Sequence, residues 1–169
     1  MFQRGAAIAR RPGRPTAGPP TPAVCRVFVS SAQFLGGELG GLDGADAHCQ
    51  ALAAAAGLPG PFRAWLSDSR ESPSSRFARS YGLPYTLVDG TVVAADWDEL
   101  VSGYLQAPIG LDEWGSATLA TSSHFCSQLA PDVAVRTNTN PDGSRFDETL
   151  TDTCQDWTSS VDPATTARK

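Results

Sequence analysis

The stretch GGLDGADAHCQALAAAAGLPGPFRAWLS, residues 40–67, is the part of the sequence around which the rest of the chain is organised. It predicts a helix with Asp43 as its N-cap and Asp46 in its first turn, where a carboxylate favours the helix dipole. Small apolar residues then recur at helical spacing on one face: Ala45, Cys49, Leu52, Ala53 and Ala56. Gly57 suits the left-handed residue after a helix, and residues 62–67 alternate as a strand does. Because its apolar face is built of small residues, the helix can lie close to a sheet.

Length and composition favour one α+β domain. The chain has 169 residues, of which 41% are hydrophobic, with 16 Gly and 13 Pro, which suits a loop-rich fold better than a helical bundle. Residues 1–24 contain four arginines and no acid, and we expect them to be a disordered basic tail. The folded domain is expected over residues 25–160, with a second disordered tail at 161–169.

The charge distribution of the chain indicates which kinds of binding partner to expect. The net charge is -5, and the acidic residues all lie beyond the basic tail, which argues against nucleic acid as the main partner. No apolar run approaches the ~20 residues needed to cross a bilayer, so we expect no membrane span.

Further elements are predicted along the chain. Residues 25–30 alternate as a first strand, and Asp89-Gly90 between β-rich runs predicts a hairpin. Asp96 is expected to cap a short helix with Glu99 in a capping-box-like position. Residues 140–143 (NPDG) predict a turn, and residues 111–114 and 133–135 are candidate short strands.

The chain has four cysteines, Cys25, Cys49, Cys126 and Cys154, and all four are disulfide candidates. An even count permits two disulfides with three connectivities. No C-x-x-C spacing occurs, so zinc-knuckle and thioredoxin-type sites lose their usual support. We expect an oxidising compartment, secreted or at the cell surface, although no signal peptide is visible in this chain.

Three segments carry a family resemblance: residues 40–69 (GGLDGADAHCQALAAAAGLPGPFRAWLSDS), 96–103 (DWDELVSG) and 153–160 (TCQDWTSS). Together they resemble a bacterial extracellular domain family of unknown function, which is similar in turn to endostatin. The resemblance covers roughly residues 26–160. It implies a C-type-lectin-like fold and a non-enzymatic, extracellular binding role.

The resemblance also implies that the domain is incompletely closed. Members of this family continue to a final strand that returns beside the first one and carries two more cysteines. Those cysteines pair with the ones that match Cys49 and Cys154. Residues 161–169 contain Pro163 and no Cys, and they do not alternate, so we expect the closing strand to be missing and the first strand to keep an unpaired edge.

Catalytic and metal sites find little support in the sequence. His48 neighbours Cys49 and His124 lies near Cys126, but neither pairing has local support as a nucleophile and base. Carboxylates beside tryptophans could serve a glycosidase, and they are equally suited to capping helices: Asp96, Asp98, Glu99, Asp112 and Glu113. Residues 137–142 (TNTNPD) offer oxygens to calcium but also form an ordinary turn. We therefore expect no cofactor, no resident metal and no enzymatic activity.

One basic cluster remains as a binding candidate: Arg63, Arg70, Arg76 and Arg79. Guanidinium groups bind sulfate and phosphate in bidentate fashion, and exposed arginines bind sulfated glycans in endostatin. We expect a binding module whose partner is a glycan or an extracellular protein. The alternatives are a carbohydrate-active hydrolase with paired carboxylates, or a structural or adhesion domain without a small ligand.

Overall fold

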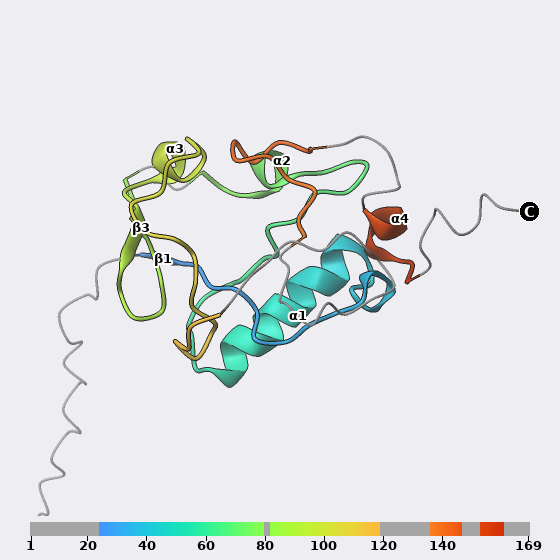
Figure 1. Cartoon of the computed structure of the whole chain (residues 1–169), viewed down its shortest axis with the longest axis horizontal. Coiled ribbons are helices and arrows are strands. Elements are labelled where there is room, and N and C mark those ends of the chain that lie inside the picture. The colour runs from blue at the N-terminus through green and yellow to red at the C-terminus, as the bar shows by residue number, and fades with distance from the viewer. Residues whose placement is uncertain (1–23, 80–81, 119–135, 147–152, 161–169) are drawn as a thin grey trace, which may run out of the picture.

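The computed structural model describes residues 24–79, 82–118, 136–146 and 153–160 (Figure 1). They form an α+β fold with a small three-stranded sheet, which confirms the predicted class. The tails predicted for residues 1–24 and 161–169 lie outside the described residues, apart from Val24. The elements in chain order are β1 (Cys25–Arg26), the 3-10 helix η1 (Gly36–Glu38), α1 (Gly41–Ala55), α2 (Pro73–Arg76), β2 (Tyr85–Thr86), β3 (Val92–Ala94), α3 (Trp97–Leu100) and α4 (Cys154–Trp157).

The sheet has the order β1-β2-β3. β1 runs parallel to β2, and β2 and β3 form the antiparallel hairpin predicted from Asp89-Gly90. Gly90 has a φ of 92°, and the Asp89 carboxylate accepts a 2.9 Å hydrogen bond from the Thr91 amide. Within the described residues β1 is therefore an edge strand. Residues 161–169, which could have covered it, lie outside them.

Helix α1 begins two residues before the predicted N-cap. Gly40, with a φ of 69°, takes the N-cap position, and Asp43 lies inside the first turn without a capping hydrogen bond. The cause is the path of the preceding chain, which folds back so closely that a Cβ on Gly44 would meet the Leu39 carbonyl oxygen at 2.0 Å. The predicted end is confirmed, because Gly57 has a φ of 70°.

The strand predicted over residues 62–67 is wrong. The segment passes beside α1, where side chains of the helix bind the amides that a neighbouring strand would bind. The Phe62 amide donates to the Gln50 side chain and the Ala64 amide to the Asp46 carboxylate, each at 2.9 Å. These two acceptors lie one helical turn apart, which matches the spacing of alternate residues in an extended chain.

Local capping and turn signals are confirmed elsewhere. Asp96 accepts from the Glu99 amide at 3.0 Å, and the Glu99 carboxylate accepts from the Ala95 amide at 2.6 Å. Asn140 and Gly143 close the predicted turn at 2.9 Å. Residues 111–114 contribute only an isolated bridge, between Leu111 and Ala117, and residues 133–135 lie outside the described part.

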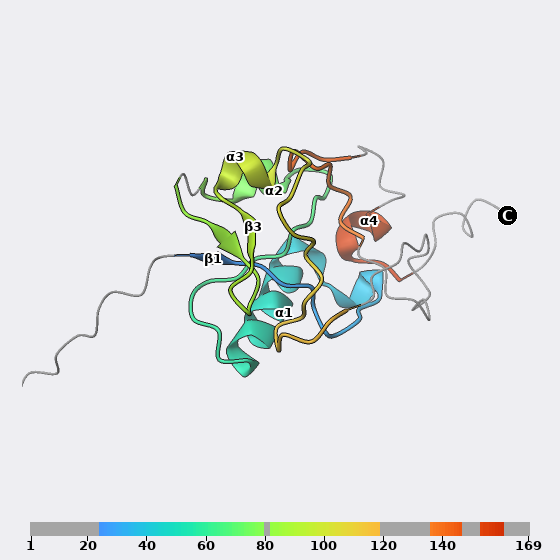
Figure 2. The same cartoon turned by 60° about the vertical axis from the view of Figure 1, so that its left-hand side comes forward.

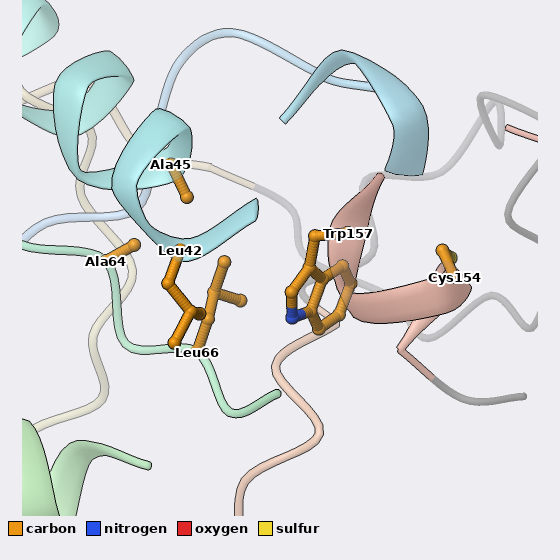
Figure 3. Close-up of a cluster of buried hydrophobic side chains, with 6 residues drawn as sticks. All are labelled: Leu42, Ala45, Ala64, Leu66, Cys154 and Trp157. Atoms are coloured by element: carbon orange, nitrogen blue, oxygen red, sulfur yellow. The ribbon is translucent and has the colours of Figure 1, made fainter. Parts of the chain in front are cut away.

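Two separate hydrophobic clusters form the core. The first joins α1 to α4 and contains Leu42, Ala45, Ala64, Leu66, Cys154 and Trp157, with Trp157 facing the leucines (Figure 3). The second joins the hairpin to α3 and contains Tyr85, Leu87, Val93, Ala94, Trp97 and Leu100. Trp97 is buried, whereas Trp65 is only partly buried against the second cluster. α1 lies on one side of the molecule and α2 and α3 on the other, in Figure 1 and again in Figure 2.

Among the described residues, no helix is long and apolar enough to cross a membrane.

Candidate functional site

A large cavity lies between the two hydrophobic clusters. Its volume is about 1450 Å³, which exceeds the roughly 300–1,000 Å³ of ordinary small-molecule pockets. Both clusters line it, with Leu66 and Trp157 from the first and Tyr85 and Leu100 from the second. A domain of this size usually has one contiguous core, so the cavity interrupts packing that would otherwise be continuous.

One wall of the cavity is the chain from Val24 to Ser30, which includes β1. The amides of Cys25 and Val27 donate to oxygens of the β2 segment, and the Val29 amide donates to the Leu111 oxygen, each at 2.9 Å. Because alternate residues of an extended strand direct their backbone groups to opposite sides, Arg26 and Phe28 direct theirs away from β2.

A second wall is the segment over residues 59–66, whose amides bind side chains of α1. Asp46 organises this wall because one of its oxygens binds the Ala64 amide and the other binds the Arg76 guanidinium at 2.6 Å. Arg63 approaches the same carboxylate at 3.9 Å. Phe62 meets Phe28 of the first wall, with their ring centroids 5.4 Å apart.

Two free thiols, Cys25 and Cys49, also line the cavity. Burial, together with the nearby charges of Asp46 and Glu113, raises the pKa of Cys49 to about 11. A thiol with so high a pKa is a poor nucleophile at neutral pH. Cys154 is disulfide-bonded, and Cys126 lies outside the described residues.

The four candidate arginines do not form one cluster. Arg63, Arg70 and Arg79 are exposed, but the Arg76 side chain is only 5% exposed and is bound to Asp46, so Arg76 does not join them as a binding candidate. Burying a guanidinium is costly unless a carboxylate pairs with it, and Asp46 supplies that partner. Arg70 lines a separate, smaller hollow together with Asp43, Asp68 and Glu71.

The candidate carboxylates accept hydrogen bonds from backbone amides. Asp112 accepts from the amides of Trp114 and Ser116, and Glu113 accepts from the amide and hydroxyl of Ser31. Both carboxylates are buried. These two carboxylates, like Asp96 and Glu99 at the start of α3, therefore stabilise local structure. Asp98 is the exposed carboxylate among these five candidates.

The described histidine and the calcium candidate at residues 137–142 also contact neighbouring groups of the chain. His48 contacts the Glu38 carbonyl oxygen at 3.2 Å, and its ring centroid lies 4.4 Å from the Phe34 ring centroid at a tilt of 35°, whereas His124 lies outside the described residues. In residues 137–142 the Asp142 carboxylate accepts from the Ser144 amide within the turn. No group of three or more His, Cys, Asp or Glu residues in the described part of the chain is arranged to hold a metal ion.

Sequence reasoning missed the cavity, because the chain segments that line it are distant from one another in the sequence. The one local signal was Arg26, a charged residue inside an alternating strand. No protein-family model matches the chain, and no curated protein matches it significantly.

Proposed function

We propose that this domain is a non-enzymatic binding module, secreted or exposed at the cell surface, and that the cavity between the two clusters is its binding site. The cavity volume of about 1450 Å³ is the observation that carries this proposal. Leaving so much apolar surface uncovered is costly for a folded domain, and an occupant that covers it gains the corresponding hydrophobic free energy.

The proposed fold is C-type-lectin-like and similar to endostatin. The order of local elements supports it: a helix carrying Cys49, a glycine turn at Gly57 and a short Trp-led helix capped by Asp96. The disulfide at Cys154 supports an oxidising compartment.

The alternatives receive less support. A hydrolase would need two carboxylates free to act on a glycosidic bond, and Asp112 and Glu113 are buried with backbone partners. A sulfated glycan would need arginines gathered on one surface. Arg76 is bound to Asp46, and Arg70 lies among carboxylates.

The proposal is tested with an apolar anionic dye, anilinonaphthalene sulfonate, which fluoresces when it enters an apolar site. We expect saturable binding to a protein that unfolds cooperatively, with NMR shift changes at cavity residues such as Val27 and Leu52. Leu52→Asp places a like charge in the cavity wall and should abolish binding. Ala51→Asp, on the exposed side of the same helix, is the matched control.

Circular dichroism is the check that both variants remain folded. Dye binding that is equal in the two variants, or absent from the folded unmodified protein, refutes the cavity as the site. A glycan array with and without calcium tests the glycan alternative in parallel.

A further inference from the structure

We propose that the cavity accepts a β-strand from a different polypeptide: an extended segment with alternating apolar residues and at least one Asp or Glu. This inference rests on the function proposed above and specifies the class of ligand. It follows from three features of the cavity in the described part of the chain, which are its apolar walls, its open backbone edges and its charge.

The apolar walls require an occupant that contacts both clusters at once. Leu66 and Trp157 lie on one side, and Tyr85 and Ile109 lie on the other. A strand has two faces, and its alternate side chains point in opposite directions. An inserted strand would therefore place one set of side chains on each cluster and make the core continuous.

The backbone edges favour a peptide over a lipid or another apolar small molecule. Arg26 and Phe28 direct their amides away from β2, and in the described part of the chain no hydrogen bond is formed by the amides of Arg63 and Trp65 in the second wall. Open strand edges bind extended peptides through main-chain hydrogen bonds. Each wall is about seven residues long, or roughly 20 Å, which is the length of an ordinary strand.

The charge of the lining identifies the strand as acidic. Among the described residues, four arginines line the cavity and no Asp or Glu does: Arg26, Arg63, Arg76 and Arg136. Arg76 is bound to Asp46. Arg63 also lies 3.9 Å from Asp46, but its side chain is 54% exposed, and Arg26 lies on the open edge. A carboxylate on the occupant would pair with these two guanidinium groups.

The same charge disfavours the other sources of a strand. Two copies of this chain that met edge to edge would bring two Arg26 side chains together, and like charges across an interface are repulsive. Residues 1–23 are also basic, with four arginines and no acid. A different, acidic chain is the source that the charges favour.

The experiment selects binders from a displayed library of random decapeptides on the full-length, folded protein. We expect the enriched sequences to alternate apolar residues and to contain Asp or Glu. The best peptide should displace the dye. N-methylation of the peptide residues that face one wall should weaken peptide binding by at least tenfold, because a methyl group removes the amide donor. N-methylation of the alternate residues, which face the other wall, should also weaken binding, but by a different factor.

Charge reversal at Arg26 tests whether the bound strand is acidic. Arg26→Glu should weaken binding of the selected acidic peptide about tenfold and reduce its salt dependence. Arg70→Glu, on an exposed arginine outside the cavity, should leave both unchanged. Because Arg26 forms no ion pair within the described residues, the variant is expected to fold.

Specific outcomes overturn the inference. Selection of no peptide, of basic peptides only, or of peptides whose binding N-methylation does not affect would each refute it. Dimerisation of the free protein through β1, or NMR contacts that place this chain's own residues in the cavity, would identify a different occupant. If the dye binds and no peptide does, the inference fails while the proposed function stands, and if neither binds, both fail.

Discussion

Replacing Asp46 should destabilise the protein more than replacing any other acidic residue of α1. Its carboxylate binds the Ala64 amide at 2.9 Å and the Arg76 guanidinium at 2.6 Å, and the Arg76 side chain is only 5% exposed. Breaking a buried ion pair by removing one partner typically costs about 3–5 kcal/mol. Asp46 is itself 20% exposed, and Glu71 lies 3.7 Å from Arg76 as a second acid, so both features reduce the cost.

We therefore expect Asp46→Ala to lower the free energy of unfolding by about 2–4 kcal/mol. Asp46→Asn keeps an oxygen for the Ala64 amide and loses only the charge, so we expect about 1–2 kcal/mol. The matched control is Asp43→Asn in the first turn of the same helix, where the residue is exposed and the expected loss is within about 1 kcal/mol.

The assay is urea unfolding followed by tryptophan fluorescence, with a double-mutant cycle that combines Asp46→Asn with Arg76→Gln. A coupling free energy of about 1 kcal/mol or more is expected for residues in direct contact. The reasoning is refuted if the two losses simply add, or if Asp46→Asn costs no more than Asp43→Asn.

Three further predictions use different probes. Gly36→Ala should destabilise the fold, because its Cβ would lie 2.6 Å from the Cβ of Cys154, whereas Gly110→Ala meets nothing within 4 Å and should be close to neutral; thermal melts of the two variants compare them. Trp157→Phe should lower the free energy of unfolding in urea by about 1–3 kcal/mol, because the buried Ser67 carbonyl oxygen loses its 2.9 Å hydrogen bond from the indole. A decrease below about 0.5 kcal/mol would contradict this. Cys49, with a pKa of about 11, should react with iodoacetamide on the order of a hundredfold more slowly at pH 8 than an exposed thiol, and mass mapping measures the rate. Since the unfolded chain loses its thiol proton at lower pH than the folded one, the contribution of Cys49 to stability should also fall as the pH rises from about 9 to about 11, and fast alkylation at pH 8 would refute the raised pKa.

The sequence by itself determined the features that depend on a few neighbouring residues. Gly57 ends α1 and Asp96 caps α3 because each satisfies backbone groups within its own turn. Asp89-Gly90 forms the hairpin turn because glycine adopts the positive φ that the second turn position needs. The α+β class followed from length and composition, which likewise require no knowledge of distant partners.

Only the tertiary structure decided where alternating segments would find hydrogen-bond partners. Residues 62–67 have the alternation of a strand, yet their amides bind Gln50 and Asp46 on α1, and the sequence pattern is the same whichever partner the chain meets. The Arg76 side chain is buried because α2 places it next to Asp46, thirty residues earlier in the chain. A pattern of neighbouring residues cannot predict a contact over that separation. The cavity has the same origin, since it is the space between two clusters whose members are adjacent only after the chain has folded.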